Sequence, residues 1–508
     1  MGNKEGCENF ELMEYGRKDV GRASGLYSPK SKRFRVLLMI GFSMFAQGIM
    51  KTNLSMAMVC MVNSTFEDAN SLSNDTPPII GCDLPTELTV EAKTSYDGTL
   101  EWSSEAQSNI FSAFFWGGVV SVCCCTWLSN KFGPSNVLLA GAAINVIGSF
   151  LTPLAADLGV FWIILLRAIM GAGQGIQYPL GATVAAAWFP KEEKSSAVAF
   201  YTNGNQMSYV VAMLVSSQIC QMRSIGGWRA IFYIYGAVGA LMCILWRWIV
   251  RDTPHDCNDI SDAEKELICG KMTSKQVAKD TPWKTLLTSP LIITLVVCTI
   301  GQSVSIITLT TYLPSYFKHV QRMDLTNNGF WSALPFLCQT IMKFIVGGSA
   351  DALKRKYPKK IDLITKISNC LATFGCAICL ALVSLLPCGH PVLAVLLITV
   401  GTSCLSGYTG GYFTALISVA PLHTVAINSV SRTFGQLASA VTPNYVGFVT
   451  QTNSPIEWLI VFFTIAAILV VSGVMFITFG TVTPQSWSLP ENQKSKSCPA
   501  RIAETNEK

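Results

Sequence analysis

Apolar residues recur along this chain in runs of about 20 residues, separated by short polar segments. A run of this length, wound as an α-helix, crosses the roughly 30 Å hydrocarbon core of a bilayer. The first half is predicted to contain spans over residues 34–61, 107–130, 135–156, 159–189, 196–220 and 229–250. The second half is predicted to contain spans over residues 287–317, 328–350, 362–386, 391–420, 425–450 and 457–481. The pattern therefore predicts an all-α, polytopic membrane protein with twelve transmembrane helices in two six-helix bundles.

Polar segments divide the chain into five parts. These are a tail, a six-helix bundle, a linker, a second six-helix bundle and a second tail, over residues 1–33, 34–250, 251–286, 287–481 and 482–508. In the linker, Ser261 is followed three residues later by Glu264, which is the pattern of a helix N-cap. Similar short motifs follow corresponding spans of the two halves, so the bundles are predicted to be related repeats.

Lysine and arginine predict which side each loop faces. They cluster before the first span, at Lys191 and Lys194, and between Lys354 and Lys360, and such clusters stay in the cytosol. Both tails are then cytosolic, and the long acidic loop over 62–106 faces the outside or a lumen. That loop carries N-glycosylation sequons at Asn63 and Asn74, which are predicted acceptors.

Composition agrees with a membrane protein, because half of the residues are hydrophobic and only 13% are charged. Most of the 18 cysteines lie in apolar runs, where they are expected to be packing residues. Cys82 and Cys388 lie in predicted outer loops, so a disulfide between them is left open. The four histidines are scattered without metal-ligand spacing, and no metal site is predicted.

Four cations lie inside predicted spans, namely Lys51, Arg167, Lys343 and Arg432, whereas no aspartate or glutamate lies well inside any span. A charge at lipid depth costs roughly 2.5–3.5 kcal/mol on insertion scales, so such a residue is a functional candidate. A bound anion would supply the missing counter-charge, and the four cations are predicted substrate contacts. Alternatively, Lys51 snorkels to the outer interface, and Lys343 and Arg432 bond backbone carbonyls.

Uncharged polar residues also occur inside the predicted spans. They are predicted either to line a water-filled cavity or, equally, to form hydrogen bonds between neighbouring helices. The predicted lining residues are Gln174, Asn205, Gln206, Gln302 and Tyr312.

Several motifs together resemble the anion-cation symporter family of the major facilitator superfamily, which includes sialin, vesicular glutamate transporters and sodium-phosphate cotransporters. The motifs are "KTNLSMAMVCMVN" from Lys51, "RAIMGAGQGIQYP" from Arg167, "WFPKEEKS" from Trp188, "GWRAIFYIYGAVG" from Gly227, "TYLPSYF" from Thr311 and "NGFWSALPF" from Asn328. The resemblance implies twelve helices, alternating access, and coupling to protons, sodium or membrane potential. It also implies that Arg167 contacts an anionic substrate.

The chain departs from the family pattern at several charged positions. Lys51 stands where the family usually has arginine, and Gln174 replaces a glutamate that the family uses for coupling. Ser418 opens "SVAP" where many relatives have an acidic residue, and Arg432 replaces an asparagine. Proton coupling through position 174 is therefore not expected.

The sequence predicts a secondary transporter that moves small organic or inorganic anions. It is expected to need no cofactor beyond a coupling ion, sodium or proton. Its expected partners are the anion and membrane lipid, not nucleic acid. A non-transporting anion sensor on the same scaffold is the alternative, and an enzyme is not expected, since no catalytic constellation lies in the spans. Plasma, lysosomal and vesicular membranes all remain open.

Overall fold

The computed structural model describes residues 31–63, 98–189, 191–252, 283–386, 390–420, 423–483 and 485, together with Ile260, Glu264 and Ile268. Sequence features in the remaining segments, including Asn74, Cys82, Ser261 and Cys388, lie outside the described residues.

The first bundle is formed by the helices between residues 32 and 249. They are α2 (Lys32–Met61), α5 (Ser104–Phe132), α6 (Pro134–Leu158), α7 (Val160–Gly175), α8 (Gln177–Trp188), α9 (Lys191–Gln221), the short 3-10 helix η1 (Arg223–Ile225) and α10 (Trp228–Ile249). The helices α7 and α8 continue one another with a break at Ile176, so together they make one predicted span.

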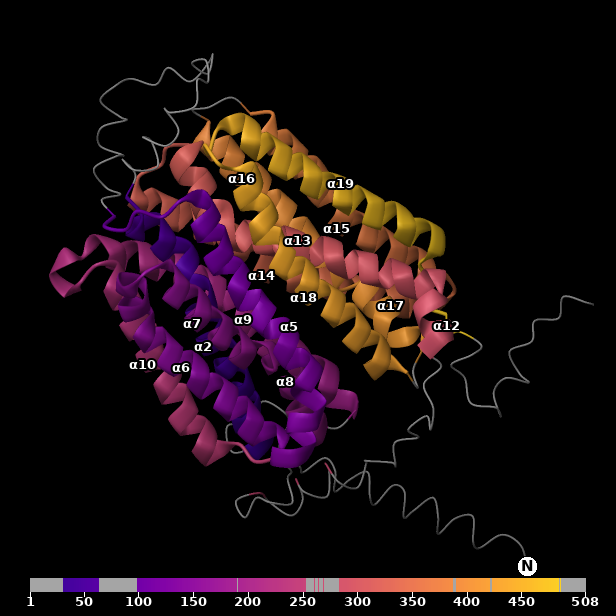
Figure 1. The fold of residues 1–508 in the computed structure, drawn as a ribbon. Helices are drawn as coiled ribbons and strands as arrows, with labels where there is room; N and C mark the ends of the chain where they lie inside the picture. Colours follow the sequence, from indigo (N-terminus) through magenta and orange to yellow (C-terminus); the bar gives the residue numbers. More distant parts are fainter. Residues whose placement is uncertain are drawn as a thin grey trace, which may run out of the picture.

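The second bundle follows α12 (Trp283–Thr288). Its elements are α13 (Pro290–His319), α14 (Leu325–Lys356), η3 (Pro358–Lys360), α15 (Ile361–Ser384), α16 (Pro391–Cys404), η4 (Leu405–Tyr408), α17 (Tyr412–Ser418), α18 (Thr424–Val449) and α19 (Pro455–Phe479). Figure 1 shows the two bundles as neighbouring groups of long helices. The predicted all-α class is confirmed, and the one β-type pairing in the described residues is an isolated bridge between Val62 and Leu100.

Ten spans in the described part of the chain are long and apolar enough to cross a membrane. Two further helices, α9 and α18, have the required length but carry more polar residues. Both lie inside the assembly rather than at its lipid face, because α9 packs between α2 and α14 while α18 packs between α5 and α13. Their polarity therefore reflects a position at the junction of the two bundles.

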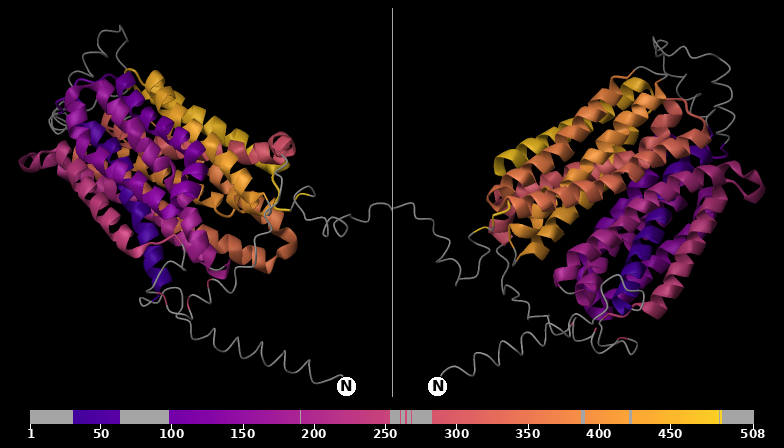
Figure 2. Two further views of the ribbon diagram at one scale, coloured as in Figure 1. Left: turned by 60° about the horizontal axis from the view of Figure 1, so that its bottom comes forward. Right: turned by 180° about the vertical axis from the view of Figure 1, so that it is seen from behind.

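The two bundles are joined in the outer half of the molecule. Ser55 Oγ donates to Thr311 O, Ser104 Oγ donates to Thr450 O at 2.8 Å, and Ser112 Oγ donates to Ala440 O at 2.6 Å. Each bond runs from the first bundle to a backbone carbonyl of the second. Figure 2 shows that the bundles lie side by side and diverge toward the cytosolic ends of their helices.

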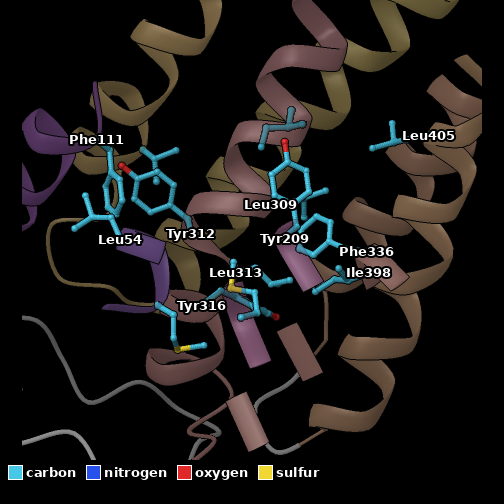
Figure 3. Packing of buried hydrophobic residues seen from close by; sticks show 14 of the residues in the cluster. Leu54, Phe111, Tyr209, Leu309, Tyr312, Leu313, Tyr316, Phe336, Ile398 and Leu405 are labelled. Carbon is cyan, nitrogen blue, oxygen red and sulfur yellow. The ribbon is translucent and has the colours of Figure 1, made fainter. Parts of the chain in front are cut away.

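Aromatic pairs fill the same junction. The rings of Phe111 and Tyr312 are 5.5 Å apart between α5 and α13, and those of Tyr209 and Phe336 are 5.4 Å apart between α9 and α14. Figure 3 shows both pairs within one buried cluster. Such pairs contribute roughly 0.5–1.5 kcal/mol beyond their buried area, so the outer junction is held by packing as well as by hydrogen bonds.

A disulfide that the sequence did not suggest joins Cys60 to Cys220, with the two Cα atoms 6.5 Å apart. Cys60 lies at the outer end of α2 and Cys220 at the outer end of α9. The bond fixes two helices of the first bundle to each other on the outer face. The predicted acceptor Asn63 lies three residues after Cys60, and its backbone N–H bonds Leu100 O at 2.9 Å.

The linker docks on the cytosolic end of α2. The carboxylate of Glu264 accepts hydrogen bonds from Ser31 Oγ, from the backbone N–H groups of Lys32 and Arg33, and from Arg33 Nε. Burial by itself would raise the pKa of Glu264, but the hydrogen bonds from Ser31, Arg33 and Lys32 outweigh it and lower that pKa. The carboxylate therefore caps the first turn of α2 in its charged form.

Candidate anion site

Arg167 lies on α7 with only 2% of its surface exposed. Its Nη2 donates to Lys51 O on α2 at 3.3 Å, and its guanidinium carbon lies 4.9 Å from the centre of the Phe114 ring on α5. The remaining nitrogens, Nε and Nη1, are buried and have no hydrogen-bond partner. One backbone carbonyl and one ring face leave most of the positive charge uncompensated.

Lys51 lies beside Arg167 and is partly buried. Its Nζ lies 4.9 Å from the centre of the Phe115 ring, so adjacent phenylalanines of α5 hold the two cations. The two positive charges are close enough to repel each other. Among the described residues, neither cation forms a salt bridge.

A small cavity of about 20 Å³ separates the cations from the second bundle. Its walls are formed by Lys51, Thr52, Ser55, Phe111, Phe114, Phe115, Arg167, Thr310 and Thr311. This volume holds about one water molecule. Hydroxyl groups of α2 and α13 face the cations across it, so helices of both bundles enclose the charged site and a larger anion requires them to separate.

Lys343 and Arg432 do not join this cavity. The guanidinium carbon of Arg432 on α18 lies 5.4 Å from the centre of the Tyr178 ring on α8, and Lys343 Nζ on α14 donates to Thr202 Oγ1 on α9 at 3.4 Å. Tyr178 comes eleven residues after Arg167, about 16 Å nearer the cytosol along the helix axis. The structure therefore brings Lys51 and Arg167 together and places Lys343 and Arg432 in separate contacts outside their cavity.

The predicted polar residues have separate environments. Gln174 Nε2 donates to Gln177 Oε1 at 2.6 Å, and Gln177 in turn donates to Ser43 O at 2.9 Å. The side-chain oxygen of Gln174, Oε1, is buried and has no hydrogen-bond partner. Position 174 thus belongs to a neutral amide chain between α7, α8 and α2.

The other predicted lining residues lie on helices at the junction of the bundles. Asn205 Nδ2 donates to Tyr209 Oη at 2.8 Å, and Gln206 Nε2 reaches Gln339 Oε1 across the junction at 3.4 Å. Gln302 accepts a short hydrogen bond from Tyr412 Oη. The bonds of Gln206 and Gln302 join different helices, whereas the Asn205 bond stays within α9, and the predicted lining role stays a prediction.

Tyr312 is part of the outer junction. Its hydroxyl donates to Pro443 O at 3.1 Å and to Ser108 Oγ of the first bundle at 3.3 Å. Tyr312 also lines a second small cavity on the outer side, which shares Ser55, Phe111 and Thr311 with the walls of the charged site. The two cavities are therefore neighbours that share part of a wall.

The sequence did not single out Phe114 and Phe115, which hold the two cations. They lie in an apolar run where aromatic residues are common, and only the fold turns them toward Lys51 and Arg167. In the described part of the chain, no group of three or more His, Cys, Asp or Glu side chains has the geometry of a metal site.

Comparison with known proteins identifies the family of this chain and several similar proteins. The sequence profile of the Major Facilitator Superfamily matches residues 36–443. An uncharacterised transporter of Caenorhabditis elegans is 27% identical and covers 92% of each chain. Human sialin is 29% identical over 91% of this chain and 92% of its own, and mouse sodium-dependent phosphate transport protein 3 is 28% identical over 90% and 95%.

Solved structures with the same architecture are more distant in sequence. A bacterial homologue of the human lysosomal transporter Spinster, in an inward-facing and unoccupied conformation, gives a TM-score of 0.62 at 13% identity and covers 89% of this chain and 98% of its own. The inward-open xylose transporter of E. coli gives 0.62 at 14% identity, covering 88% and 96%. Both structures share the fold of this chain.

Proposed function

Because the chain belongs to the Major Facilitator Superfamily, we propose that it is a multi-pass secondary transporter that carries small anions by alternating access, with Arg167 and Lys51 as the anion-binding pair. The single observation that carries this proposal is the state of Arg167. Its guanidinium is almost fully buried, two of its nitrogens lack partners, and no carboxylate among the described residues pairs with it. A bound anion supplies both the charge and the missing acceptors.

The names of the relatives support an anionic cargo. Sialin and the sodium-dependent phosphate transport protein match nearly the full length of this chain. A carboxylate or phosphate oxygen pair fits the planar guanidinium of Arg167, while Lys51 adds a point charge. The relatives are described as transporters, which gives the sensor alternative no support. Plasma, lysosomal and vesicular membranes are all compatible with this function.

We further propose that the driving force is sodium or the membrane potential, and not a proton carried by a carboxylate inside the spans. The acidic residues of the described spans lie near helix ends, as Glu105, Asp157, Asp362 and Glu457 do. At the family's coupling position, Gln174 cannot gain or lose a proton at physiological pH.

The test is uptake of labelled anions into proteoliposomes, with phosphate, glutamate and sialic acid supplied under separate sodium, proton and potential gradients. We expect one anion class to accumulate, and Arg167→Ala to reduce its uptake by at least about 100-fold, the scale of removing a buried charge partner. Lys51→Arg keeps the charge and should retain transport. Arg229→Ala, which removes an exposed arginine paired with Asp157 far from the cavity, is the matched control.

Folded wild-type protein that accumulates none of these anions under any gradient contradicts the proposed transport. Uptake that survives Arg167→Ala at the wild-type rate contradicts the assignment of the site but not the transport.

A further inference from the structure

Arg432 has a position that substrate binding at Arg167 does not explain. It is exposed, although it lies within α18 at the junction of the bundles, and its guanidinium faces Tyr178 of the first bundle at 5.4 Å. The hydroxyls of Tyr201 and Tyr412 are also within electrostatic reach. Among the described residues, no carboxylate pairs with this cation.

Two contacts join the bundles on the cytosolic side of the charged site, namely Arg432–Tyr178 and Lys343–Thr202. Both contacts are weak interactions, since Arg432–Tyr178 is a cation–π contact at an exposed site and Lys343–Thr202 is a hydrogen bond of 3.4 Å. The outer junction instead has several shorter hydrogen bonds and two aromatic pairs. Because the contacts on the cytosolic side are weaker, a small competing interaction there can separate the bundles.

An anion is such a competitor. A guanidinium binds a carboxylate or phosphate more strongly than it binds a phenol ring, because the anion supplies a full charge and paired acceptors. Resting on the proposed anion transport, we propose that Arg432 is a second anion contact on the exit path, and that an anion taking Arg432 from Tyr178 releases the cytosolic contact between the bundles. The ligand is the transported carboxylate or phosphate itself.

This arrangement gives the two arginines different duties. Arg167 is buried and determines affinity, whereas Arg432 is exposed, about 16 Å closer to the cytosol, and determines how fast the anion leaves. Lys343, bonded to Thr202 across the same junction, adds positive charge on that path. Arg432 thus acts as a gating residue without being part of the first binding site.

The test separates binding from turnover in purified protein and in proteoliposomes, using the labelled anion found to be transported. For Arg432→Gln we expect the dissociation constant to stay within about threefold of wild type while turnover falls about tenfold, the change that corresponds to about 1.4 kcal/mol. Arg229→Gln removes an arginine that also lies over a ring, Trp228 at 5.0 Å, but outside the cavity, and it should change neither quantity.

A second measurement follows the cytosolic contact directly. Gln436 is half-buried on α18, one turn from Arg432 on the side away from the cytosol, so Gln436→Cys reports access from the cytosol past the Arg432–Tyr178 contact. The exposed Cys123 and Cys124 and the predicted cytosolic cysteines Cys7, Cys257, Cys269 and Cys498 are replaced by serine. We expect saturating anion to raise labelling several-fold when Arg432 and Tyr178 are present. With Tyr178→Leu, labelling should be high with or without the anion.

Three results overturn the inference. They are wild-type turnover in Arg432→Gln, a loss of affinity in Arg432→Gln as large as in Arg167→Ala, and labelling at position 436 that does not respond to the anion. If wild-type protein neither binds nor moves an anion, the proposed function itself is wrong. The uptake experiment with Arg167→Ala detects that failure separately.

Discussion

At the scale of single residues, the protein compensates the charge of Arg167 only in part. An arginine near the middle of a span costs roughly 2.5–3.5 kcal/mol on insertion scales, and a cation over a ring face returns about 0.5–2 kcal/mol. The ring of Phe114 and one carbonyl of Lys51 therefore offset only part of the cost of burying Arg167. In the proposed transport, the anionic cargo would supply the rest.

Position 174 is where the proposed absence of proton coupling can be tested. Gln174 donates to Gln177, and its own carbonyl oxygen is buried without a partner, so Gln174→Glu would place a proton-binding oxygen where an unpaired acceptor now lies. We expect wild-type uptake to be unchanged between external pH 5.5 and 7.5, and Gln174→Glu to make uptake depend on an inward proton gradient. Initial uptake rates at fixed membrane potential measure both.

Gln218→Glu makes the same substitution at an exposed position of α9 and serves as the control. Wild-type uptake that already rises with an inward proton gradient would sink the proposed coupling.

At the scale of elements, glycines allow α5 and α7 to pack in backbone contact. A Cβ on Gly171 would lie 1.7 Å from Phe114 O, and one on Gly117 would lie 1.8 Å from Ala168 O. The backbone that carries Phe114 thus lies directly against the helix that carries Arg167. Small residues at such interfaces let membrane helices approach closely.

Gly171→Ala should force these two helices apart, because the clash is with backbone and not with a flexible side chain. Overpacking of this kind costs typically about 1–3 kcal/mol, and more where no neighbour can shift. We expect a fall of several degrees in the thermal unfolding midpoint and loss of uptake. Gly348→Ala is the matched control, since its Cβ would meet nothing within 4 Å; equal midpoints for the two variants would refute the packing argument.

At the scale of the whole molecule, the outer faces of the bundles are joined and the cytosolic ends diverge. Alternating access requires the outer hydrogen bonds, such as Ser104–Thr450 and Ser112–Ala440, to break while new contacts form on the other side. The Cys60–Cys220 disulfide does not oppose that motion, because both cysteines belong to the first bundle and move together.

Removing this disulfide should lower stability without blocking transport. Disulfides typically contribute about 2–4 kcal/mol to the free energy of unfolding. We expect Cys60→Ser, Cys220→Ser and the double variant to lower the unfolding midpoint equally, since each breaks the same bond. Cys370→Ser removes a half-buried free thiol and is the control. Additive losses in the double variant would show that the two cysteines are not bonded.

The sequence by itself determined the architecture. Apolar runs must cross the bilayer as helices because backbone groups in hydrocarbon need internal hydrogen bonds, so the all-α class and the two bundles could be predicted. The sequence also predicted the spans that contain α9 and α18, although both helices are polar, because the spans on either side of each must be connected across the membrane. The same reasoning singled out Arg167, Lys51, Lys343 and Arg432 as candidates, since a charge in an apolar run can be seen in the sequence alone.

Only the tertiary structure decided which of these residues meet. Lys51 and Arg167 lie 116 residues apart and come together on the rings of Phe114 and Phe115. Arg432, which looks equivalent in sequence, instead faces Tyr178 on the cytosolic side. The pairing of Cys60 with Cys220 was equally hidden. Helix periodicity fixes the depth and face of a residue on its own helix, whereas its partners depend on how separate helices pack against one another.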